Sequence, residues 1–180
     1  MICLNFYIVD FSLGILIVLI VILLYSFEKL NRKSWIIYWI GFLLGLAWEL
    51  PMSIANKYSP FPPASFITPM PSHFIVIVII HSFWDGGLFL IGYLLVLKLC
   101  DDPHFEGFNC RELGVLVAWG QLSELGVELI STFNDAWVFN VYWWNPQLFK
   151  FNGHNITLLP QLIWLIAPLT FYCIIINYHI

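Results

Sequence analysis

Five ionisable side chains that could do chemistry lie within the apolar segments of this chain. They are Glu49, His81, Asp85, Glu124 and Glu128. A charge at bilayer depth costs roughly 3 kcal/mol or more on insertion scales, and we expect no intramembrane Lys or Arg to accompany these groups. At least one of Asp85, Glu124 and Glu128 should therefore be protonated near neutral pH. A protonated carboxyl beside an ionised one is a general acid and base pair.

The segment from Trp119 to Ser131 carries three polar groups at helical spacing. Gln121, Glu124 and Glu128 stand at i, i+3 and i+7, so a helix places them on one stripe. A helix with two carboxyl groups on one face must turn that face toward protein or water. This stripe is therefore the best candidate for part of a functional site.

Four tryptophans lie on four different predicted helices near the polar groups. The face of an indole ring attracts a cation, although these rings could also serve only in packing. An acid, a base and an aromatic wall together suit the protonation of an apolar alkene or epoxide and the capture of the resulting carbocation. The tryptophans are Trp48, Trp84, Trp119 and Trp164.

We assign the roles in this site as follows. Glu49 and Asp85 are the expected proton donor and acceptor, in either order, and His81 is expected to tune them. Glu49 is also close enough to its helix end to reach the interface by snorkelling. The other members are Glu124 and Gln121 on the opposite wall, Gln161 and Trp164 over the cation, and Glu128 as a weaker member that could instead lie among headgroups.

Purely structural interpretations compete with these roles. His81 and Asp85 stand at i and i+4 and could simply pair with each other. Asp85 could form only a structural hydrogen bond to Gln121 or Ser123. Asp10 lies near the end of its apolar segment, and we expect it to be solvated.

The composition is that of an integral membrane protein. Of 180 residues, 61% are hydrophobic and 10% are charged, against roughly 25% charged in soluble domains. No basic patch indicates nucleic-acid binding. We expect membrane lipids and an apolar lipid substrate as partners, with a homo-oligomer or a membrane complex left open. The sequence indicates no cofactor, and the four cysteines show no spacing typical of a disulfide framework.

Hydropathy predicts an all-α, polytopic membrane protein with five transmembrane helices in a single bundle, forming one domain over residues 1–180. About 20 apolar residues suffice to span roughly 30 Å. The first helix lacks a basic region before it, so we expect an anchor rather than a cleaved signal. Connections 55–72 and 132–157 are rich in proline or in aromatic residues and are expected to be interfacial segments or lids. The predicted helices are 8–27, 35–54, 73–99, 112–131 and 158–178.

The basic residues predict an orientation. The first and third connections hold five Lys and Arg residues and the second and fourth hold two, which favours an outside or lumenal N-terminus and a cytoplasmic C-terminus. In a eukaryote the membrane would be the endoplasmic reticulum. Asn155 begins a glycosylation sequon on the outer side. The polar groups share the outer half of their helices, which predicts one cavity lined by the second to fifth helices.

Several short motifs are similar to known membrane enzymes. Gly120-Gln121 and Trp164 to Pro168, behind Gln161, resemble the corresponding helices of the EXPERA family, the emopamil-binding, sterol Δ8–Δ7 isomerase type. Ala47 to Glu49 also resembles the small membrane terpene cyclases of fungi. The resemblance implies helices around a pocket in which acids and a tryptophan shift a double bond or open an epoxide. Where the isomerase pattern has a histidine one turn before the acid, this chain has Gly45.

Other classes of function remain open. A metal site could use His81, Asp85, Glu124 and Glu128 from facing helices, although the Glu-x-x-His pairs of di-iron bundles and the His-Glu-x-x-His motif of zincins are both absent. A proton or cation pathway is disfavoured because the cytoplasmic half lacks polar groups. A non-catalytic subunit or a lipid-binding module of a larger complex would also fit the small polar fraction.

Overall fold

The computed structural model describes residues 6–69 and 72–178, so Cys3 and Pro71 lie outside the described residues. Over that part of the chain the fold is all-α, with two minor sheets. The five helices are each long and apolar enough to cross a membrane, as predicted. They are α1 (Phe6–Ser26), α2 (Arg32–Tyr58), α3 (Phe74–Leu99), α4 (Cys110–Phe133) and α5 (Leu158–Tyr178).

Polar residues at the helix starts explain where the helices begin. Asn31 accepts the Ser34 amide at 2.8 Å before α2, and Asn109 accepts the Arg111 amide at 2.9 Å before α4. Such caps satisfy amides that have no partner inside the helix. The α2 helix also continues through Pro51 to Tyr58, beyond its predicted end at residue 54. The proline removes one intrahelical bond there but does not end the helix.

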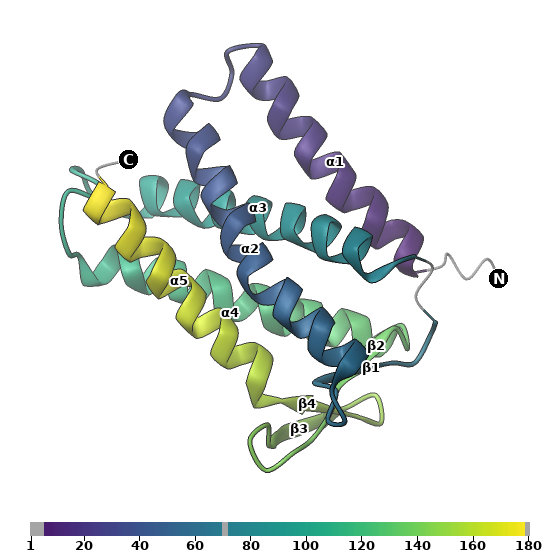
Figure 1. Ribbon diagram of the computed structural model, residues 1–180. Helices are drawn as coiled ribbons and strands as arrows, with labels where there is room; N and C mark the ends of the chain where they lie inside the picture. The colour runs from purple at the N-terminus through teal and green to yellow at the C-terminus, as the bar shows by residue number, and fades with distance from the viewer. Residues whose placement is uncertain (1–5, 70–71, 179–180) are drawn as a thin grey trace.

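The two long connections form short antiparallel strands. In the second, β1 (Ala64–Phe66) pairs with β2 (Trp137–Phe139) of the fourth. The fourth connection also forms a hairpin of β3 (Gln147–Phe151) and β4 (His154–Thr157). The β1–β2 sheet joins segments about 70 residues apart in sequence, and it lies at the same end of the bundle as the start of α1 (Figure 1).

Glycines allow the helices to approach each other closely around α3. A Cβ atom at Gly45 of α2 would lie 2.5 Å from Asp85 Oδ2, and one at Gly14 of α1 would lie 2.7 Å from an Ile80 methyl carbon. Figure 1 shows α2 crossing α3 and the first turns of α1 close to the start of α3, while α4 and α5 contact each other on the other side of the bundle. The small residues therefore fix where α1 and α2 meet α3.

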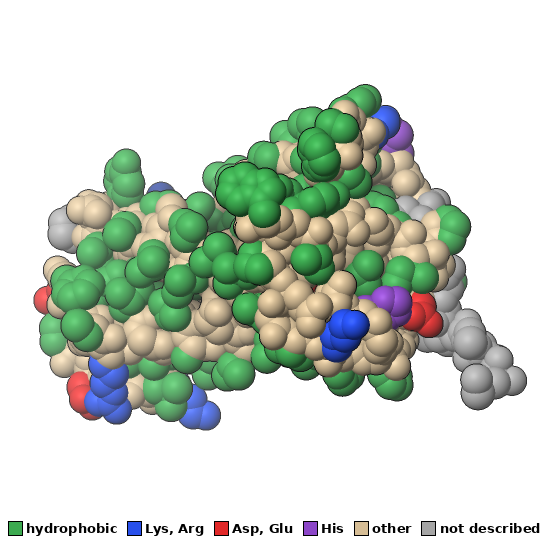
Figure 2. Space-filling view, turned by 90° about the horizontal axis from the view of Figure 1, so that it is seen from below, with side chains coloured by type: hydrophobic (Ala, Val, Ile, Leu, Met, Phe, Trp, Pro, Cys, Tyr) green, Lys and Arg blue, Asp and Glu red, His purple; other side chains and the backbone are tan. Residues whose placement is uncertain are grey.

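The outer surface is largely apolar. Figure 2 shows hydrophobic side chains over most of one face, while charged side chains gather toward its two ends. Exposed leucines and isoleucines are especially frequent along α1. A surface of this kind matches the hydrocarbon region of a bilayer rather than water.

Candidate functional site

A cavity of about 290 Å³ lies at the end of the bundle that the β1–β2 sheet covers. All five helices contribute to its wall, so the prediction of a cavity lined only by the second to fifth helices omitted α1. Most of the lining is apolar, and no Lys or Arg is among its described residues. From the predicted site, the lining includes Trp48, Glu49, His81, Trp84, Asp85, Glu124 and Trp164.

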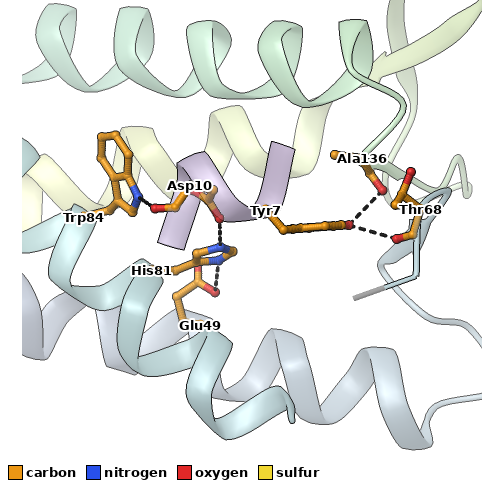
Figure 3. Close-up of polar contacts among 7 residues, drawn as sticks. All are labelled: Tyr7, Asp10, Glu49, Thr68, His81, Trp84 and Ala136. Carbon is orange, nitrogen blue, oxygen red and sulfur yellow. Dashed lines mark hydrogen bonds and ion pairs between the residues drawn. The ribbon is translucent and has the colours of Figure 1, made fainter. Parts of the chain in front are cut away.

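His81 holds a central place among the polar groups. Its Nε2 lies 3.0 Å from Oδ2 of Asp10, and its Nδ1 lies 3.5 Å from Oε2 of Glu49. Asp10 is on α1, Glu49 on α2 and His81 on α3, so this group links three helices (Figure 3). The alternative in which His81 pairs with Asp85 is not what the structure contains, since the imidazole points to the other two carboxyl groups.

Asp10 was expected to be solvated, and that expectation is wrong. Its side chain is only 11% exposed, and its backbone carbonyl accepts the Trp84 indole N–H at 3.1 Å. The β1–β2 sheet covers the end of α1, so a position near a helix end is not a position in water. The available signal was that Asp10 is the one charged residue in the whole of α1, because an isolated acid in an apolar helix needs a partner.

Asp85 lies deeper, against the surface of α2. Only 6% of the residue is exposed, and Oδ2 has no hydrogen-bond partner among the described residues. The structural hydrogen bond to Gln121 or Ser123 is absent there, and the Ser123 hydroxyl is itself buried without a described partner. A carboxylate left in this state would cost several kcal/mol. A neutral carboxylic acid at this position avoids that cost.

Glu124 and two clustered tryptophans also line the cavity. Glu124 reaches the lining from α4 with 7% of the residue exposed. The rings of Trp48 and Trp164 meet edge to face with centroids 5.6 Å apart, and Phe89 stacks on Trp164 at the same distance. The indole rings of Trp48 and Trp164 thus line the same cavity as the acids.

Three predicted members of the site instead form a separate network between α4 and α5. The Gln121 amide donates to the Gln161 carbonyl at 2.9 Å, and the Gln161 amide lies 3.5 Å from Glu128 Oε2. Glu128 Oε1 accepts the Thr157 amide at 3.0 Å. None of the three is among the described lining residues. At about 100° per residue, Gln121, Glu124 and Glu128 spread over about 60° of the α4 surface. Glu124 stands at the edge of this stripe that borders the cavity, and the other two residues contact α5 and the residue before it.

Trp119 also lies outside the cavity lining. Its indole N–H donates to the Leu88 carbonyl at 2.8 Å, and its ring lies against Gly92. Trp119 is about 160° around α4 from Gln121, so it packs on α3 rather than facing the cavity.

The β1–β2 sheet contributes lining residues that the sequence did not place in the site. Phe66 of β1 and Trp137 and Phe139 of β2 line the cavity together with Phe6 of α1. The Tyr7 hydroxyl lies 3.1 Å from the Thr68 carbonyl and 3.0 Å from the Ala136 carbonyl, which ties α1 to both connections (Figure 3). The sequence showed that these connections are rich in aromatic residues, but it did not show that β1 pairs with β2.

The site offers general acid and base groups but no metal-ligand cluster. Within residues 6–69 and 72–178, no group of three or more His, Cys, Asp and Glu side chains could hold a metal ion. Cys100, Cys110 and Cys173 are free thiols. Comparison of the chain with models of protein families, with curated proteins and with solved structures found no match.

Proposed function

We propose that this protein is a membrane-embedded isomerase or cyclase that acts on a sterol-like or isoprenoid-like lipid by protonation and carbocation stabilisation. The observation that supports it is an apolar cavity lined both by the Glu49–His81–Asp10 group and by Asp85, a buried acid whose Oδ2 has no hydrogen-bond partner among the described residues. Acid and base groups in one apolar pocket suit chemistry on a substrate that offers only a double bond or an epoxide.

Asp85 is the proposed proton donor. Its proton passes to an alkene carbon, the π electrons form the new C–H bond, and a carbocation remains. With an epoxide, the proton passes to the oxygen as a C–O bond breaks. The rings of Trp48 and Trp164 stabilise the cation. These steps need no oxidant or reductant.

Glu49 is the proposed proton acceptor. In an isomerisation it removes a proton from the carbon next to the cation, and the electrons of that C–H bond form the new double bond. His81 takes up the proton from Glu49 in turn, because Nδ1 lies 3.5 Å from the carboxyl oxygen. Exchange with water then returns the site to its starting state.

The walls of the cavity favour a substrate that arrives from the bilayer. Its lining includes residues of α1 and α4 that are also exposed on the lipid-facing surface, namely Val9, Leu13, Val127 and Ile130. An apolar lipid could therefore reach the acids without crossing water. We further propose that the cavity end of the bundle faces the outside or the lumen. In a eukaryote, the proposed membrane is that of the endoplasmic reticulum.

Lipid extracts from cells with and without the protein, analysed by mass spectrometry, test this function. Asp85→Asn, Glu49→Gln and Glu124→Gln should each lower formation of the converted lipid, by about 100-fold or more for the acid and base. Asp101→Asn is the matched control, because Asp101 is exposed in the third connection, where it pairs with Arg111 of α4 and lies outside the cavity lining.

Two results would contradict the proposal. If no lipid changes with the wild-type protein, or if all three variants convert it normally while remaining folded, the catalytic role fails. A lipid that copurifies with the protein and stays chemically unchanged would instead favour a lipid-binding module.

A further inference from the structure

Asp10 stands out because α1 is otherwise uncharged. The helix from Phe6 to Ser26 has no other Asp, Glu, Lys or Arg. Its carboxyl group is nearly buried, and it is the closest acidic group to the His81 ring, at 3.0 Å. An acid at this depth is costly unless it interacts with a specific partner.

The position of α1 does not depend on that carboxyl group. The Trp84 indole binds the backbone carbonyl of Asp10, which any residue would supply. Gly14 allows close packing on Ile80. The Tyr7 hydroxyl lies within hydrogen-bond distance of backbone carbonyls in the second and fourth connections. The side chain of Asp10 can therefore be changed while the contacts that seat the helix remain.

The geometry gives that carboxylate an effect on the chemistry of the imidazole. A carboxylate in its ionised form only accepts hydrogen bonds, so with Asp10 in that form Nε2 of His81 carries a hydrogen toward it. In the neutral ring this leaves the Nδ1 lone pair facing Glu49. A proton can then leave Glu49 Oε2 and bond to Nδ1, and the imidazolium formed donates to both carboxylates. Figure 3 shows Asp10 and Glu49 on the two sides of the ring.

We propose that Asp10 is a positioning residue that fixes the tautomer and orientation of His81, so that α1 belongs to the site and is not only a membrane anchor. This proposal rests on the proposed function, in which Glu49 accepts a proton. The effect of the Asp10 carboxylate on the tautomer of the His81 imidazole can be measured without any lipid substrate.

Nitrogen-15 NMR of histidine-labelled protein in lipid nanodiscs tests the contact directly. His81→Gln identifies the His81 signals by their loss. In the wild type, Nε2 should give the signal of a hydrogen-bonded N–H group. Asp10→Asn should move that signal toward an unprotonated nitrogen, because the amide can donate to Nε2. Asp10→Glu should restore most of the wild-type spectrum. An Asp10→Asn spectrum identical to the wild type would overturn the proposal.

The conversion of lipid provides the second readout. Asp10→Asn should lower product formation about 10- to 100-fold, as for other groups that orient a working histidine, and Asp10→Glu should recover part of it. Asp101→Asn should leave both readouts unchanged. Normal conversion by a folded Asp10→Asn protein would also overturn the proposal.

The two proposals fail in different ways. If the wild-type protein converts no lipid but the His81 signals respond to Asp10→Asn and recover with Asp10→Glu, Asp10 is still the group that orients His81. In that case the lipid-converting function is the one that is refuted.

Discussion

At the scale of single residues, the contact between Gly45 and Asp85 shapes the cavity wall. The absent side chain of Gly45 leaves room for the carboxyl group of Asp85, whose Oδ2 would lie 2.5 Å from an added Cβ atom and whose own Cβ would lie 2.8 Å from it. Both distances are below van der Waals contact, so a larger residue must displace Asp85 or separate α2 from α3.

We expect Gly45→Ala to destabilise the protein by about 1–3 kcal/mol, the usual cost of overpacking a close contact. Thermal unfolding of the purified protein in detergent measures this loss. Gly114→Ala on α4 is the matched control, because an added Cβ there meets nothing within 4 Å, and it should leave stability unchanged or slightly raised. Equal stability of the two variants would contradict the close packing described for α2 and α3.

At the scale of elements, Glu128 joins α4 to the start of α5. Only 1% of the residue is exposed, and its carboxyl group accepts the Thr157 amide where β4 leads into α5. The Gln161 side chain approaches the other carboxyl oxygen. Glu128 thus satisfies a buried backbone donor rather than lining the cavity, a task that the structure assigns to Glu124.

Glu128→Ala should destabilise the protein by about 1–3 kcal/mol, because it leaves the buried Thr157 amide without an acceptor. Glu128→Gln should cost less, since the amide oxygen can still accept that N–H group. Hydrogen exchange at Thr157 and thermal unfolding measure the two effects, and Glu106→Ala in an exposed loop is the control. The same loss from alanine and glutamine would show that this hydrogen bond is unimportant.

At the scale of the whole molecule, the two ends of the bundle differ. One end carries the cavity, the β1–β2 sheet and the β3–β4 hairpin, whose strand β4 contains Asn155 of the sequon. The other end carries the connections with the excess of Lys and Arg. Basic connections face the cytoplasm in most membrane proteins, so this difference predicts which way the cavity points.

Thiol labelling in sealed membrane vesicles tests the orientation. With Cys3→Ser and Cys173→Ser in place, a membrane-impermeant reagent should modify exposed Cys110 only from the cytoplasmic side. Cys100 should react little, since burial raises the pKa of its thiol above the ordinary value. Gln147→Cys, placed on β3 in a chain that also carries Cys110→Ser, should react only from the opposite side. The reverse pattern would invert the proposed orientation.

The sequence by itself determined the class of protein, the five helices and the end of the bundle at which the ionisable groups lie. Each of these depends on local quantities, namely the length of an apolar run and the cost of placing a charge within it. The predicted lining residues Glu49, His81, Asp85 and Glu124 could be named for the same reason.

Only the tertiary structure decided which of these groups meet. The pairing of Asp10 with His81 depends on how α1 crosses α3, and the cover over it depends on two strands from connections far apart in sequence. The rotation of α4 separates Glu124 in the cavity from Gln121 and Glu128 against α5. Helix rotations and crossings are set by close packing between segments, which the period of one helix alone does not specify.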